Sequence, residues 1–215
     1  MFKGYFHVAD IFPTLASAAG IKIGQVDGID QWNILVNGGK PLRKEVVMVL
    51  DNYDGYSGLI SDEWKLVNGT VKRFNGNYDT FLGDVEEFST PASYSQSVLN
   101  SYTGKALTCM TKNKLRKKNI ENLRQEATIT CNVDENPVNA CNLLEKPCLF
   151  NIVKDPCERT NLAENKPEIM KKMLQRLDEL TKSAVPSRRT FQSDPNCDPD
   201  FHNGTWSSWI PDNKF

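Results

Sequence analysis

The chain has 215 residues, enough for one large domain or about one and a half small ones. Its composition, with 39% hydrophobic and 25% charged residues, is that of a globular protein and excludes wholesale disorder. The 26 basic and 27 acidic side chains leave a net charge of -1, which argues against a dedicated nucleic-acid binder. No stretch approaches the roughly 18 consecutive apolar residues of a membrane span.

Cysteines and sequons indicate an oxidising compartment. All six cysteines lie between Cys109 and Cys197, and N-glycosylation sequons begin at Asn68 and Asn203. The first twenty residues lack the uninterrupted apolar core of a signal peptide. A secretory composition without a secretory start predicts that the chain is the later part of a longer protein. The alternative is that several cysteines are free thiols in a chain that is never exported.

The first expected element is a helix over residues 11–19. Asp10 is its candidate N-cap, Gly20 is a natural stop, and Pro13 falls in the first turn, where its missing N–H is tolerated. The helix is apolar on most sides, which predicts that it is buried. Residues 24–45 have a loop-like composition.

Three antiparallel strands are expected next, over residues 45–51, 56–62 and 64–68. Between the first two, Asp51-Asn52-Tyr53-Asp54-Gly55 has some likeness to a calcium loop. It lacks the alternate ligand spacing and the distal Glu, so a turn at a strand end is favoured.

Periodicity fades from residue 69 to residue 146, which predicts a long irregular stretch that disulfides hold together or that is mobile. Basic residues crowd into residues 112–118. Without interleaved aromatic side chains they indicate a solvated loop, with a polyanion-binding patch as the alternative.

A fourth strand is expected around residues 149–152, followed by a turn at Asp155-Pro156. Asn165 and Glu168 have capping-box spacing, and an apolar stripe then continues to Ala184. The sequence therefore predicts an α+β fold: a four-stranded antiparallel sheet packed by a C-terminal helix.

Two disulfides suggest themselves from proximity in the sequence. Cys148 and Cys157 flank the fourth strand and its turn, and Cys131 and Cys141 flank a loop that contains a proline. Six cysteines allow fifteen pairings, so other connectivities remain open.

No catalytic set can be assembled from the sequence. His7 and His202 are the only histidines and have no metal-type spacing, so structural roles are favoured. The stretch AVPSR, which begins at Ala184, is similar to the sulfatase motif C-x-P-S-R. Alanine stands where the motif has cysteine and cannot be oxidised to an aldehyde, so the match is a coincidence.

Five sequence blocks, in the right order, resemble the sulfatase family. They are HVADIFPTLASAAGI, VDGIDQW, LISDEWKLVNG, CLFNIVKDPCERTNLAENKPEIMKKMLQRL and DPNCDPDFHNGTWSSWIP. The first looks like the family's H-x-x-D-x-x-P-T-L helix, and the second like its D-G-x-D segment. The third is similar to its W-K-L hairpin, and the fourth to its strand, D-P-x-E-x-x-N-L-A turn and helix. The last is similar to an arylsulfatase B-like tail.

The resemblance implies a parent that hydrolyses sulfate esters, such as those of dermatan or chondroitin sulfate, in a lysosome or outside the cell. Its α/β alkaline-phosphatase-like domain would hold one calcium and a formylglycine. Residues 1–40 would be the end of that domain, with its last helix, and residues 41–215 the C-terminal domain, with an insertion near residues 69–146. No catalytic or metal-binding residue of the family falls within this chain. Cys197 is expected to pair with the missing domain.

Two functions follow as hypotheses. The first is a C-terminal fragment of an arylsulfatase B-like sulfatase that is inactive by itself. The second is a non-catalytic secreted module that binds a protein partner or a sulfated glycan. The orphaned apolar helix near the N-terminus favours the first, and the basic run around residue 115 slightly favours the second.

Overall fold

The computed structural model describes residues 2, 4–70, 91–110, 115–131, 139–187 and 194–207, without the side chains of residues 91–93. The chain divides into two compact units, Met1–Lys182 and Ser183–Phe215. The described part of the second unit contains two 3-10 turns, Pro195–Cys197 and Pro199–His202. Lys112, Lys114 and Arg188, which the sequence places in basic stretches, lie outside the described residues.

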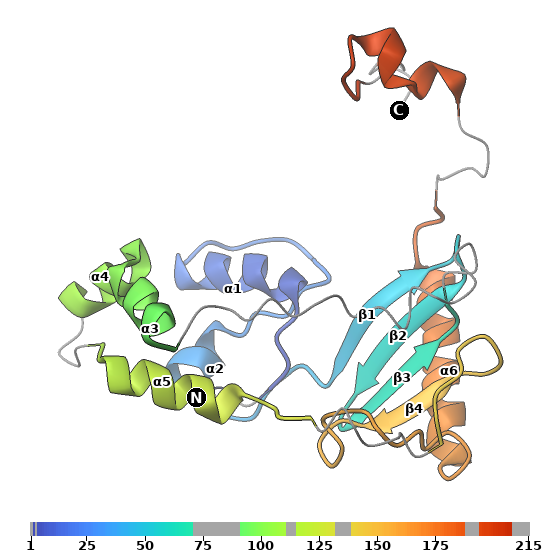
Figure 1. Cartoon of the computed structure of the whole chain (residues 1–215), viewed down its shortest axis with the longest axis horizontal. Helices are drawn as coiled ribbons and strands as arrows, with labels where there is room; N and C mark the ends of the chain where they lie inside the picture. The colour runs from blue at the N-terminus through green and yellow to red at the C-terminus, as the bar shows by residue number, and fades with distance from the viewer. Residues whose placement is uncertain are drawn as a thin grey trace. The chain divides into compact units, whose positions relative to one another are not determined.

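A four-stranded antiparallel sheet is the main feature of the first unit (Figure 1). Its strands follow chain order and are β1 (Glu45–Asp51), β2 (Tyr56–Ser61), β3 (Trp64–Asn68) and β4 (Cys148–Asn151). The strands expected from the alternating and apolar runs of the sequence are therefore confirmed to within a residue or two.

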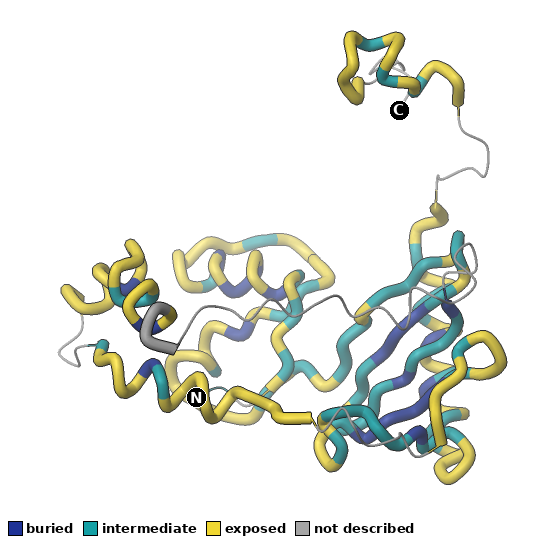
Figure 2. The backbone as a smooth tube through the Cα atoms, in the orientation of Figure 1, coloured by how far each residue is buried: buried dark blue, intermediate teal, exposed yellow. Residues whose placement is uncertain are grey.

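The core lies between this sheet and the long helix α6 (Pro167–Ser183). Leu59, Leu66 and Leu149 are paired across β2, β3 and β4 and are fully buried. Met173 and Leu177, one turn apart on α6, pack against this row. Figure 2 shows the buried residues concentrated along the central strands. The α+β prediction, with its apolar stripe on the C-terminal helix, is confirmed.

The N-terminal segment forms a 3-10 turn (Val8–Asp10), α1 (Ile11–Ala18) and α2 (Trp32–Asn37). The loop expected over residues 24–45 was therefore partly wrong: a six-residue helix is too short to show clear periodicity. On α1 only Pro13, Thr14 and Ala16 are buried. The expectation that α1 is buried on most sides is not met in this chain, because its large apolar side chains Ile11, Phe12 and Leu15 are exposed, as is Val8 in the turn before it.

Three helices occupy parts of the stretch expected to be irregular: α3 (Pro91–Asn100), α4 (Tyr102–Met110) and α5 (Lys117–Ala127). Ser95 donates a hydrogen bond to Glu121 at 3.1 Å, and the Arg124 guanidinium lies 4.0 Å from the centre of the Tyr94 ring. These contacts join α3 to α5. The solvated loop expected around residue 117 is instead the first turn of a helix. Across the described segments, no helix has the length and apolarity needed to cross a bilayer.

Candidate functional site

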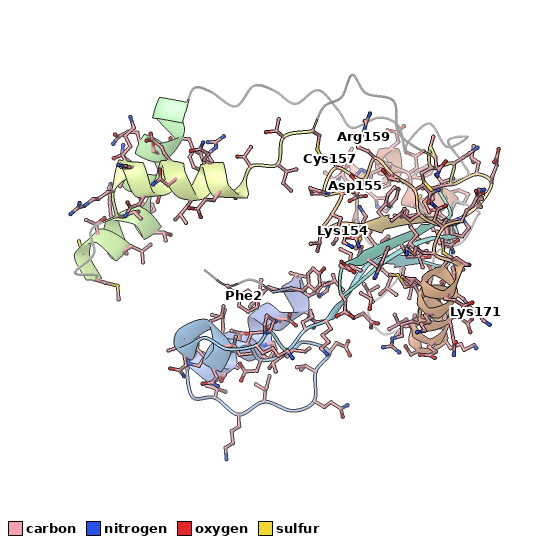
Figure 3. The ribbon with its side chains drawn as sticks, turned by 90° about the horizontal axis from the view of Figure 1, so that it is seen from below. Phe2, Lys154, Asp155, Cys157, Arg159 and Lys171 are labelled. Carbon is pink, nitrogen blue, oxygen red and sulfur yellow. A yellow bond between two sulfur atoms is a disulfide. The ribbon has the colours of Figure 1, made fainter. Side chains whose placement is uncertain are left out.

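The loop that follows β4 carries the most distinctive motif of the sequence, D-P-x-E-x-x-N-L (Figure 3). Asp155 closes it at both ends: its N–H donates to Asn151 O at 2.8 Å, and its Oδ2 accepts from Thr160 N at 2.7 Å. A carboxylate that accepts a backbone N–H a few residues later stabilises a turn, and this is the role of Asp155 here. The motif is therefore a structural loop in this chain.

Asn161 connects this loop to the outer edge of β4. Its side chain is 6% exposed, and its Oδ1 accepts from Leu149 N and from Ala163 N, each at 3.1 Å. Leu162 N donates to Leu149 O at 2.7 Å. The backbone groups of Leu149 that face away from the sheet are thus satisfied. A buried N–H left without an acceptor costs about 1–3 kcal/mol, so this asparagine stabilises an edge strand that would otherwise be open to pairing.

Glu158 joins the loop to the β2–β3 hairpin. Lys65 Nζ, from the W-K-L segment of β3, lies 2.7 and 2.6 Å from the two carboxylate oxygens of Glu158. The side chains are 18% and 32% exposed, so water screens this pair only partly. Two blocks that are 93 residues apart in the sequence are therefore in contact through opposite charges.

Two disulfides surround the same loop. Cys131 is bonded to Cys157, and Cys141 to Cys148. The four cysteines are those suggested by the sequence, but both suggested pairs were wrong because the partners are exchanged. The reason lies in where the loop places Cys157: its Sγ lies 3.8 Å from Thr130 O, in the segment that follows α5, whereas Cys148 in β4 lies beside Cys141.

A second cluster surrounds Asp10, which is fully buried. Its carboxylate accepts hydrogen bonds from Arg43 Nε at 2.7 Å and from Arg43 Nη2, from Ile29 N at 2.8 Å and from His7 N at 2.9 Å. Burial favours the neutral acid, but the hydrogen bonds from Arg43 and the backbone outweigh it and hold the pKa of Asp10 well below its ordinary value. Asp10 stands at the expected N-cap position of α1, but its side chain makes no cap bond to that helix.

This Asp10 cluster is structural. It fastens the start of α1 to the segment before β1 and gives Arg43, which is only 14% exposed, its counter-ion. His7 caps the preceding 3-10 turn through its Nδ1, which accepts from Ala9 N at 3.2 Å. No local pattern indicates the Asp10–Arg43 pair, because the two residues are 33 positions apart.

The remaining candidates for chemistry also have structural partners. His202 Nε2 lies 2.7 Å from Asn196 O. Asp51 Oδ1 accepts from Tyr53 N and Asp54 N, both at 2.9 Å, as expected for a strand-end turn. Among the described residues, no group of three or more His, Cys, Asp or Glu side chains is placed to hold a metal ion.

The first sequon lies in the first unit, and the second sequon and the last cysteine lie in the second. Asn68 is the last residue of β3 and is half-buried. Asn203 is exposed and has a left-handed backbone, with φ of 56°, after the turn Pro199–His202. Cys197 closes the preceding turn and is one of two described cysteines without a disulfide, the other being Cys109.

We expect Cys197 to react as a free thiol or to pair between molecules in the oxidised chain, because a partner for it would lie in a further domain. Alkylation followed by mass spectrometry of proteolytic peptides should show labelled Cys197 beside the linked pairs Cys131–Cys157 and Cys141–Cys148. An intramolecular disulfide that contains Cys197 in most molecules would refute this expectation.

No family model matches the chain. It is 27% identical over 231 aligned positions to mouse (Mus musculus) arylsulfatase J; the match covers 96% of this chain and 31% of the relative. The chain therefore spans about a third of the length of that relative. This similarity confirms the resemblance to the C-terminal part of a sulfatase that the motifs indicated.

One solved structure, of a protein from the metabolism of multiple glycosaminoglycans by Bacteroides thetaiotaomicron, is similar to this chain, with a TM-score of 0.40 and 15% identity. That match covers 80% of this chain and 24% of the other. A TM-score of this size is too low to establish a shared fold.

Proposed function

We propose that this chain, which resembles the C-terminal part of a sulfatase, is the C-terminal domain of an arylsulfatase B-like sulfuric ester hydrolase. The observation that carries the proposal is the loop after β4. Three residues of its motif have structural contacts: Asp155 closes the loop, and Glu158 and Asn161 join it to the sheet. The sulfatase-like motif of this chain thus builds a scaffold, and the chemistry would belong to another domain.

The exposed apolar face of α1 and of the 3-10 turn before it supports a partner domain. Val8, Ile11, Phe12 and Leu15 are between 47% and 73% exposed, whereas the opposite side of the helix is buried. A contiguous apolar surface of this kind is typical of an interface. Mouse arylsulfatase J is about three times as long as the aligned region. We therefore assign this face to contact with an N-terminal sulfatase domain.

The substrate, the compartment and the cofactors are part of the proposal. We propose sulfated glycosaminoglycans as the substrate class and a lysosomal or extracellular location, which the two disulfides support. Calcium and a formylglycine would be supplied by the N-terminal domain. The described residues of this chain do not fit either group: they offer no cluster of carboxylates for a cation, and no cysteine of the sequence stands in a C-x-P-S-R motif.

The isolated chain is expected to show no hydrolysis of an aryl sulfate, with or without calcium and the enzyme that generates formylglycine. The reason is that the sequence contains no C-x-P-S-R motif to supply the nucleophile, and that the described residues form no cluster that could hold a metal ion. Release of the phenol from a chromogenic aryl sulfate measures this directly. Turnover above that of buffer, abolished by substitution of a residue in this chain, would contradict the proposal.

A second candidate, a non-catalytic module that binds a sulfated glycan, is favoured by the start of α5. Arg116, Lys117 and Lys118 are consecutive there, and all three are exposed. Cations at a helix N-terminus are opposed by the helix dipole, so the fold itself gains little from this placement. A polyanion bound there would offset the repulsion.

Immobilised dermatan sulfate tests this candidate. Lys117→Glu with Lys118→Glu should lower the salt concentration at which the chain elutes, because two cationic contacts are reversed. Lys171→Glu with Lys172→Glu is the matched control, since it reverses an exposed lysine pair on α6. An equal decrease for both pairs would show that only net charge matters and would remove the second candidate.

A further inference from the structure

Asn68 lies on the inner side of the sheet although it is polar. Ser57 pairs with Asn68 and Leu59 pairs with Leu66 across β2 and β3. Side chains two residues apart on a strand share a face, so Asn68 is on the same face as Leu66, which packs against α6. The Asn68 side chain therefore projects toward the helix at the end of the sheet.

There it lines a hollow of about 340 Å³ between the sheet and the second half of α6. This volume is at the lower end of the roughly 300–1,000 Å³ of small-molecule pockets. Its walls combine apolar surface, on which the face of a sugar ring can pack, with oxygen atoms that can bind the hydroxyl groups of the sugar. The lining includes Tyr56, Ser57, Leu174, Leu177, Asp178 and Thr181.

Thr70 provides a second, independent observation. It is the third residue of the sequon Asn68-Gly69-Thr70 and is 2% exposed. Its buried Oγ1 has no hydrogen-bond partner among the described residues. A buried hydroxyl without a partner costs stability, and valine of the same shape would avoid that cost. No hydrogen bond among the described residues therefore accounts for this hydroxyl, whereas N-glycosylation requires a hydroxyl at this position.

Gly69 fixes the sequon beside the β1–β2 turn. It has φ of 72°, and a Cβ on it would lie 2.1 Å from Gly55 O. This close approach holds Asn68 at the rim of the hollow, because Gly55 is itself one of the lining residues.

We propose that Asn68 carries an N-linked glycan whose first sugar lies in this hollow, against Leu174 of α6. In the transfer, Asn68 Nδ2 loses a proton and forms a bond to the anomeric carbon of a polyprenyl-diphosphate-linked oligosaccharide. The bond from that carbon to the phosphate oxygen breaks, and the diphosphate leaves with the electron pair. The sugar then covers apolar helix surface that the sheet leaves open. This inference rests on the secretory location given under the proposed function.

The test uses the whole chain secreted from eukaryotic cells behind an added signal sequence, so that entry into the secretory pathway is imposed. The wild type should carry two glycans, at Asn68 and Asn203. Thr70→Val should remove one and Thr70→Ser should keep both. Peptide-N-glycosidase digestion of the folded protein should release the Asn68 glycan at least about tenfold more slowly than the exposed Asn203 glycan. After denaturation the two rates should be equal.

Three results would overturn the inference: an unmodified Asn68, whether or not Asn203 is modified; equal release rates from the folded protein; or a structural role for the Thr70 hydroxyl. The last is read by comparing Asn68→Gln with Asn68→Gln/Thr70→Val, both of which lack this glycan. Their unfolding temperatures should be equal, or higher for the valine variant, and a decrease of several degrees would show a structural role. None of these outcomes bears on sulfate-ester hydrolysis.

Discussion

Met173→Asp should unfold the sheet–helix unit. Met173 is 5% exposed and packs with Leu177 against the leucine row of β2, β3 and β4. An unpaired carboxylate there is desolvated without a counter-ion, and the cost of such a substitution is about 4–5 kcal/mol or more. This is comparable with the roughly 5–15 kcal/mol that stabilises a whole domain. Loss of the cooperative unfolding transition, followed by circular dichroism, is the expected result.

Two variants serve as controls for Met173→Asp. Gln175→Asp introduces the same carboxylate on the exposed side of α6 and should change the unfolding temperature little. Leu177→Asp should reproduce the effect, because Leu177 is 4% exposed and belongs to the same cluster. If either buried variant unfolds as the wild type does, the apolar face of α6 has been misidentified.

Asp10→Asn should destabilise the N-terminal segment by roughly 3–5 kcal/mol, because it leaves the largely buried Arg43 without a counter-ion. Hydrogen exchange of the amides of α1 and of the Ile29 N–H is the suitable measurement, since the segment can open without global unfolding. Arg43→Met should have a similar effect, because it strands a carboxylate that is fully buried.

The same pair predicts a pH dependence. The pKa of Asp10 is depressed in the folded chain, so the stabilisation is complete above the unfolded-state value of about 4 and is lost as pH falls through the lower folded value. Protection of the Ile29 amide should therefore fall in acid in the wild type and depend less on pH in Asp10→Asn. Asp27→Asn, at an exposed carboxylate, is the matched control. An equal acid response in both variants would show that Asp10 does not carry the effect.

The sheet and its helix could be predicted because their signals are local and strong. β1 to β3 are short apolar or alternating runs separated by tight turns, and α6 repeats its apolar residues at helical spacing over seventeen residues. Such periodicity reflects burial on one face of an element. The buried faces form the core, which contains Leu59, Leu66 and Leu149 of the sheet and Met173 and Leu177 of α6.

The helices α2 to α5 could not be predicted with the same rules. α3 and α4 are rich in Ser, Thr, Gly and Asn, which compete with helix formation or lower its propensity. Neither is long enough to show a continuous apolar stripe. Contacts such as Ser95–Glu121 bring α3 and α5 together, and these depend on side chains that are distant in the sequence.

The site shows the same division between local and long-range information. The motif D-P-x-E-x-x-N-L was readable as a family signature, and Asp155–Thr160 is a local turn that its residues predict. The contact of Glu158 with Lys65 and the disulfide partners depend on how the loop returns to β4. Proximity in sequence pointed to the right four cysteines and to the wrong bonds.

The most direct test of the proposed function is the sequence of the transcript upstream of the codon for Met1. If the chain is the C-terminal domain of a sulfatase, the upstream sequence continues in the same open reading frame and encodes C-x-P-S-R and the family's paired metal-binding aspartates. An in-frame stop codon shortly before Met1 in the mature transcript would contradict the proposal and would favour the glycan-binding module.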